Sequence, residues 1–64
     1  MPYGHYTNKY DVYGYPKGQP SELEYLGYVR DFNNLYAREQ ATKKWRELGY
    51  TVKSVTLNRT DIRI

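Results

Sequence analysis

The residues that could do covalent or metal chemistry are few in this 64-residue chain. It has one histidine, His5, and no cysteine, which rules out a disulfide and any zinc site built on thiolates. Ser21 and Ser54 have no general base at a spacing that would activate a hydroxyl nucleophile. Glu22 and Glu24 would share one face of a strand, but carboxylates at a loop exit are more typical of a solvated surface. We therefore expect no enzyme, no metal site, no cofactor and no small-molecule substrate.

Tyrosine is the residue type that stands out. The chain has nine tyrosines beside one tryptophan and one phenylalanine, and three of the nine lie in the stretch YDVYGYP at residues 10–16. Phenol rings stack on nucleic-acid bases and are common in protein recognition surfaces. The chemistry that this composition favours is therefore non-covalent binding.

The positive charge is concentrated in the second half of the chain. The formal net charge is +3, and residues 34–49 and 50–64 each contribute +2, whereas residues 21–33 contribute −2. This distribution permits an anionic partner without requiring one. Four of the basic side chains fall on the helix predicted below: Arg38, Lys43, Lys44 and Arg46. Basic residues on a helix more commonly form a solvated surface than a binding site for phosphates.

The clearest element that could position these groups is a helix from Asn33 or Asn34 to the residue before Gly49. Asparagine is a favoured N-cap, because its side-chain oxygen accepts a hydrogen bond from an unpaired backbone N–H. Glycine commonly ends a helix. An apolar stripe at spacings of four, four and three would face the rest of the fold: Ala37, Ala41, Trp45 and Leu48.

Three segments are expected to be strands, at about 6–15, 23–32 and 51–57. The first two are joined by the Pro- and Gly-containing loop PKGQPSE, which predicts an antiparallel hairpin. The third is rich in β-branched residues. The tail NRTDIRI either prolongs it past a kink at Thr60-Asp61 or frays. The predicted fold is α+β: one small domain over 1–64, with a three-stranded antiparallel sheet, one helix on one face and the order β-β-α-β. Its ends, 1–5 and 58–64, are candidates for loose segments.

Alternation along the strands predicts what each sheet face carries. In the first strand, one face carries Tyr13 and Tyr15 and the other carries Tyr6, Tyr10 and Val12. In the second strand, one face carries Leu23, Tyr25 and Val29 and the other carries Leu26, Tyr28 and Phe32. In the third strand, Val55 and Leu57 lie on one face and Val52 lies on the other. Both faces are thus apolar or aromatic, but one helix covers only one of them. We expect the other face to remain uncovered and to show tyrosine rings. Gly14 and Gly27, in mid-strand, predict a bulge or close packing beneath an aromatic ring.

Two kinds of binding function suit such a face. The first is a nucleic-acid-binding module, in which tyrosines stack on bases and basic residues hold phosphates. The alternative is a small regulator that binds another protein, or a domain that forms a homodimer, by the same face or by a sheet edge. A chain of this size and plan would suit an accessory protein of a phage or mobile element. The candidate binding residues are Tyr13, Tyr15, Tyr28, Arg30, Lys43, Arg46, Lys53 and Arg59.

The cytoplasm is the expected location. No apolar run approaches the ~18 residues of a membrane span, and the N-terminal stretch MPYGHYTNKY has neither the charged start nor the apolar middle of a signal peptide. The lack of cysteine fits a reducing compartment. We therefore expect no membrane partner.

Overall fold

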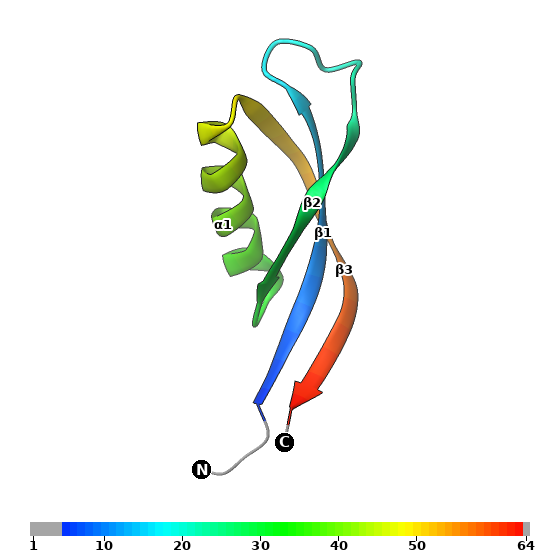
Figure 1. The fold of residues 1–64 in the computed structure, drawn as a ribbon, viewed down its shortest axis with the longest axis vertical. Coiled ribbons are helices and arrows are strands. Elements are labelled where there is room, and N and C mark those ends of the chain that lie inside the picture. Colours follow the sequence, from blue (N-terminus) through cyan, green and yellow to red (C-terminus); the bar gives the residue numbers. More distant parts are fainter. Residues whose placement is uncertain (1–4, 64) are drawn as a thin grey trace.

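The protein forms one antiparallel sheet with a helix across one of its faces (Figure 1). The structure, a computed structural model, describes the backbone of residues 5–63 and the side chains of residues 7–60; the expectation of loose ends at residues 1–4 and 64 lies outside the described residues. The elements are β1 (His5–Pro16), β2 (Glu24–Asp31), α1 (Asn34–Glu47) and β3 (Tyr50–Arg63). The sheet order is β2-β1-β3, with both pairs antiparallel. The predicted α+β fold and its β-β-α-β order are confirmed.

The third strand continues through the tail instead of ending near residue 57. Thr60 pairs with Asn8, and Arg63 pairs with His5 at the end of the β1–β3 ladder. The irregularity expected at Thr60-Asp61 lies earlier, because Asn58 is an extra residue between the pairs Lys9–Arg59 and Tyr10–Leu57. The tail is therefore part of the sheet.

Helix α1 begins and ends where its capping residues predict. The Asn33 side chain accepts a hydrogen bond from the Tyr36 N–H at 3.0 Å, and Gly49 follows the helix with a φ of 90°. The stripe prediction is wrong for Leu48, whose side chain is 62% exposed. The helix ends at Glu47, and Leu48 has left the helical path with φ −93° and ψ 2°. No helix of the described residues is long and apolar enough to span a membrane.

The core lies between α1 and one face of the sheet. Two small residues of α1, Ala37 and Ala41, let the helix axis come close to the strands, and Asn34 Nδ2 donates a hydrogen bond to the Val55 carbonyl at 2.9 Å. This layer is where the chain removes apolar surface from water. Its buried residues are Tyr10, Val12, Val29, Ala37, Ala41, Trp45 and Val55, with Leu26, Tyr50 and Val52 packed at its margin.

The two glycines in the strands mark close approaches, and the predicted aromatic ring lies over Gly27 but not over Gly14. A Cβ on Gly27 would lie 2.9 Å from Trp45 Cζ2, and the φ of 151° at this residue is one that other residues rarely adopt. A Cβ on Gly14 would overlap the Thr51 carbonyl oxygen and lie 2.8 Å from Leu26 Cδ1. Both glycines adjoin irregularities of the ladder.

Bulges move Leu26, Tyr25 and Val52 to the faces opposite the predicted ones. Leu26 is an extra residue between the pairs Val12–Gly27 and Tyr13–Tyr25, so it packs on the core while Tyr25 turns to the uncovered face. Lys53 is extra in the same way on β3, which brings Val52 to the core side with Val55. Simple alternation is wrong here, because one inserted residue reverses the facing of every residue beyond it.

A candidate binding surface on the open sheet face

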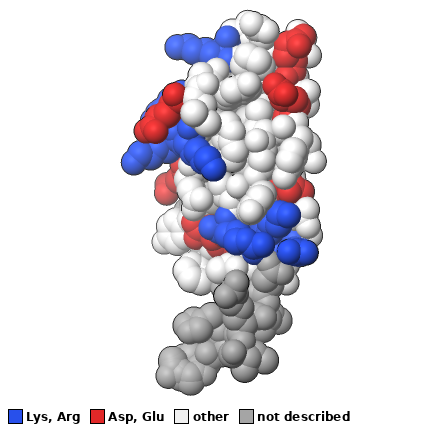
Figure 2. Space-filling view, viewed as in Figure 1, with Lys and Arg blue, Asp and Glu red and all other residues white. Residues whose placement is uncertain are grey.

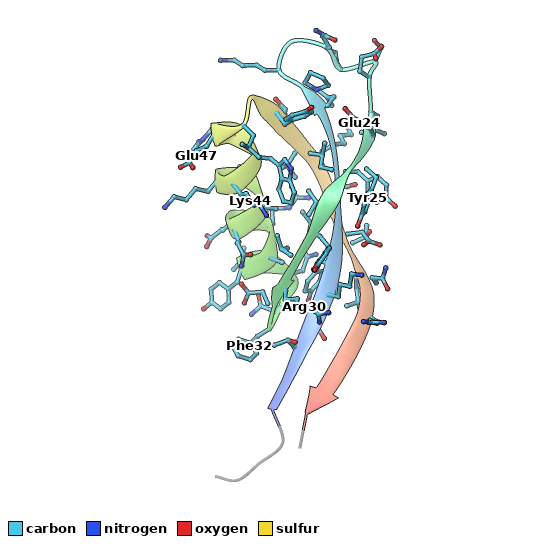
Figure 3. The ribbon with its side chains drawn as sticks, viewed as in Figure 1. Glu24, Tyr25, Arg30, Phe32, Lys44 and Glu47 are labelled. Atoms are coloured by element: carbon cyan, nitrogen blue, oxygen red, sulfur yellow. The ribbon has the colours of Figure 1, made fainter. Side chains whose placement is uncertain are left out.

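The sheet face opposite α1 carries aromatic and charged side chains from all three strands. Residues paired across antiparallel strands project to the same face, so the ladder gives the membership of this surface. We call it the open face; β1 contributes Lys9, Asp11, Tyr13 and Tyr15, β2 contributes Tyr25, Tyr28 and Arg30, and β3 contributes Thr51, Ser54, Thr56 and Arg59. Figure 3 shows Tyr25 pointing away from the helix.

Three cations form one row across the open face. Lys9 pairs with Arg30 on one side and with Arg59 on the other. Neighbouring strands lie about 4.8 Å apart, so the row places three positive charges across the width of the sheet. We call these residues the cation row. Figure 2 shows one group of Lys and Arg atoms below the middle of the view and another over α1.

Tyr28 connects the cation row to the aromatic part of the open face. Lys9 Nζ lies 4.6 Å from the centroid of the Tyr28 ring, and Arg30 Cζ lies 5.8 Å from it. Cation–π contacts at exposed sites stabilise by about 0.5–1 kcal/mol. The ring therefore helps to hold the Lys9 ammonium in place, by a contact weak enough for an anion to compete for the charge.

Tyr13 and Tyr25 form an edge-to-face pair on the same surface. Their ring centroids are 5.5 Å apart, and the ring planes meet at 67°. The side chains of Tyr13, Tyr25 and Tyr28 are 36%, 51% and 49% exposed. Tyr15 is the next residue of β1 on this face; it is half-buried and pairs with Thr51. The expected uncovered face with tyrosine rings is present.

Asp11 lies between the cation row and the Tyr13–Tyr25 pair. It pairs with Tyr28 on β2 and with Thr56 on β3, and its half-buried carboxylate accepts a hydrogen bond from Asn58 Nδ2 at 2.8 Å. The pKa of Tyr25 is raised above its ordinary 10.0, first by partial desolvation of the phenol, then by the Asp11 charge and the side-chain hydrogen bond with that carboxylate. The open face therefore has a negative centre beside its positive row.

The structure brings some of the sequence-predicted residues together and leaves others apart. Tyr13, Tyr28, Arg30 and Arg59 share the open face, with Tyr15 at its margin. Lys53, the bulge residue on β3, is exposed on the strand at the sheet edge. The two predicted binding residues on α1, Lys43 and Arg46, do not join this surface, because the sheet separates α1 from the open face.

Three charged or aromatic residues of this surface were not among the sequence candidates. Lys9 and Asp11 alternate with the core residues of β1 exactly as Tyr13 does, so position in the strand could have identified them. Tyr25 could not be found in this way, because only the bulge at Leu26 brings it to the open face.

The open face is an exposed surface and not an enclosed site. The described residues enclose no pocket, and no group of three or more His, Cys, Asp or Glu among them could hold a metal ion. Contacts here would be made by stacking, charge and hydrogen bonds on a flat support. No family model matches the chain, and no curated protein or solved structure matches it.

Proposed function

We propose that the chain is a non-enzymatic binding module that holds single-stranded nucleic acid on the open face. The observation that carries this proposal is the cation row beside exposed tyrosine rings, which Tyr28 joins through its contacts with Lys9 and Arg30. Binders of single strands combine positive charge for the phosphates with aromatic rings for the bases, and each stacked base contributes about 1–3 kcal/mol.

A single strand fits this surface better than a duplex does. Bases in a duplex are stacked on one another and offer only their edges in the grooves, so rings on a sheet could not stack on them. Unpaired bases offer a whole ring face to Tyr13 or Tyr25. The Lys9 ammonium would exchange its contact with the Tyr28 ring for a phosphate oxygen, because a charge-assisted hydrogen bond is the stronger interaction.

Salt dependence tests the proposal. We expect a labelled oligothymidylate to bind at low salt, and its duplex with oligodeoxyadenylate to bind more weakly, as measured by fluorescence anisotropy. If all three members of the cation row neutralise phosphates, the slope of log K against log salt is about −2. Lys9→Gln/Arg59→Gln should weaken binding and bring the slope to about −0.7. No binding at low salt would overturn the proposal.

The helix supplies a control with the same loss of charge. Lys43→Gln/Arg46→Gln removes two positive charges from the other side of the sheet, and we expect it to leave the salt slope unchanged. An equal effect of the two double variants would mean that net charge, and not the cation row, attracts the ligand.

A protein partner or a second copy of the chain is the other candidate. Two observations support this candidate. The sheet has two edge strands, β2 and the 14-residue β3. Exposed apolar side chains also lie where β2 leads into α1: Phe32, Leu35 and Tyr36. Edge strands are natural sites for pairing with another chain. Sedimentation velocity would then show a dimer, or a specific protein would bind the intact chain and not Tyr13→Ser/Tyr28→Ser. A strict monomer that binds no protein contradicts this candidate.

A cytoplasmic location belongs to the same proposal. It is supported by the absence of cysteine from a small chain, since small domains of oxidising compartments commonly depend on disulfides. Localisation of a tagged chain by microscopy tests it.

A further inference from the structure

The charge pattern of the open face is bipolar. The cation row lies on one side of Asp11 and the Tyr13–Tyr25 pair on the other, each two residues away along β1, which is about 7 Å in an antiparallel strand. A carboxylate in this position repels phosphate and attracts hydrogen-bond donors. A ligand that suits the whole surface must therefore carry negative charge at one end and donors at the other.

The Asp11 carboxylate is held in place and still has room for a ligand. Asn58 Nδ2 donates to its Oδ2 at 2.8 Å, and the Tyr25 phenol lies close enough for the carboxylate to raise its pKa. An ionised carboxylate has about four lone-pair sites, so the Asn58 donor leaves most of its accepting capacity unused. Because this hydrogen bond already fixes the direction of the carboxylate, the entropy cost of ordering it when a ligand binds is smaller.

We propose that Asp11 selects guanine: its carboxylate accepts N1–H and N2–H of a guanine base whose phosphates lie on the cation row. This inference rests on the proposed function and names the base that it favours. The Watson–Crick edge of an unpaired base is free for such reading, and exposed rings lie on the same face near Asp11: Tyr28 across the ladder, Tyr13 two residues along β1 and Tyr25 paired with Tyr13.

Guanine is the base with the matching edge. Its imino and amino donors are adjacent, so one carboxylate can accept both. Cytosine and adenine place their amino group beside a ring nitrogen with a lone pair, which the carboxylate repels. Thymine and uracil have one imino donor between two carbonyl oxygens. Paired donor–acceptor contacts of this bidentate kind are the ones that discriminate bases well.

A nucleotide suits the surface better than a cationic peptide does. An arginine or lysine side chain could reach Asp11 and contact the tyrosines, but Lys9, Arg30 and Arg59 lie next to it and would repel a positive ligand. A nucleotide brings its negative phosphate to these same residues. Charge complementarity over the whole face therefore favours the nucleotide.

The test uses one labelled oligothymidylate in five forms. The form with thymine throughout is compared, in anisotropy titrations at fixed low salt, with forms that carry a single central guanine, inosine, adenine or cytosine. We expect the guanine form to bind roughly tenfold tighter than the all-thymine form. Inosine keeps N1–H and lacks the N2 amino group, so it should fall between them. Adenine and cytosine should bind more weakly than guanine.

Asp11→Asn provides the matched variant. It should abolish the guanine preference and bind the all-thymine form at least as tightly as the native chain does, because a charge that repels phosphate is gone. Asp11→Ser should lose the guanine preference in the same way, so the inference can still be tested if one of the two substitutions disturbs the sheet. Amide NMR spectra show whether each variant is folded.

The outcomes separate the inference from the proposed function. Equal affinity for all five forms, or a guanine preference that survives in both variants, overturns this inference and leaves the binding function standing. No binding of any form overturns both. An oligoarginine peptide that binds more tightly than every oligonucleotide and loses its affinity in Asp11→Asn would overturn both in favour of a cationic protein partner.

Discussion

Gly27 is the residue of the sheet against which the Trp45 ring of α1 packs. Its missing side chain leaves room for the Trp45 ring, and its φ is 151°. We expect Gly27→Ala to lower the free energy of unfolding by about 2–3 kcal/mol, because backbone strain and the overlap with Trp45 each cost at least about 1 kcal/mol. Chemical denaturation followed by circular dichroism measures the change.

Gly18 is the matched control for this substitution. It also has a positive φ, of 85°, but a Cβ there would meet no atom within 4 Å. Gly18→Ala should therefore cost only the backbone strain, about 1 kcal/mol. Equal costs at the two positions would show that Trp45 does not require the gap at Gly27.

The phenol of Tyr25 gives a pH-dependent prediction. Its pKa is raised because partial desolvation and the Asp11 charge both disfavour the tyrosinate. The folded chain then holds this proton more tightly than the unfolded chain does, so the related stability is complete below about pH 10 and is lost as the pH rises through the folded pKa. Asp11→Asn should bring the pKa of Tyr25 down toward 10.0, while the effect of desolvation remains. An NMR titration of tyrosine Cζ carbons measures this, and an unchanged pKa would mean that Asp11 does not act on the phenol.

At the scale of the elements, α1 depends on the residue that caps its N-terminus. The Asn33 side chain accepts a hydrogen bond from the Tyr36 N–H at 3.0 Å, so Asn33→Ala should destabilise the fold by about 1 kcal/mol. Thermal unfolding followed by circular dichroism measures it. Glu39→Ala, on the exposed side of the same helix, should change stability by no more than about 0.5 kcal/mol. Equal melting temperatures for the two variants would show that the Asn33 cap does not stabilise the fold.

The number, type and order of the elements could be predicted from the sequence, because the Asn33 cap, Gly49 and the Ala37–Ala41–Trp45 spacing are local signals. The uncovered face could also be predicted, because the sequence indicated one helix and a sheet with two apolar faces. The facing of Tyr25 and Val52 could not be predicted. It depends on which residue of a strand the ladder leaves unpaired, and that is decided by packing between distant segments.

The candidate site was predictable to the same extent. Alternation separated Tyr13 from the core residues of β1 and Tyr28 from Val29 of β2, but it could not say which sheet face the helix covers; in the structure both tyrosines lie on the open face with Arg30 and Arg59. The cation row itself could not be seen, because it needs the register of three strands, and that register depends on the extra residue Asn58. Lys43 and Arg46 were chosen for their charge, which says nothing about the side of the sheet on which they lie.

At the scale of the whole molecule, the cover over the sheet ends before the sheet does. β1 and β3 continue together beyond α1 and β2 (Figure 1), and Leu57 is exposed although its partner Tyr10 is buried. We expect native-state hydrogen exchange of the bonded amides to be faster in residues 7–9 and 59–60 than in residues 10–14 and 52–57, since less buried surface must open there. NMR exchange rates test this. Uniform protection along the ladder would show that the helix does not set the local stability.

The placement of Trp45 has a practical consequence. Its indole is buried on the helix side of the sheet, whereas Tyr13, Tyr25 and Tyr28 are exposed on the other side. Indole emission should thus follow unfolding and remain almost constant when a ligand reaches the open face. The phenol signals should respond to the ligand first. One unlabelled sample therefore contains two intrinsic optical reporters, one for the integrity of the fold and one for occupancy of the surface.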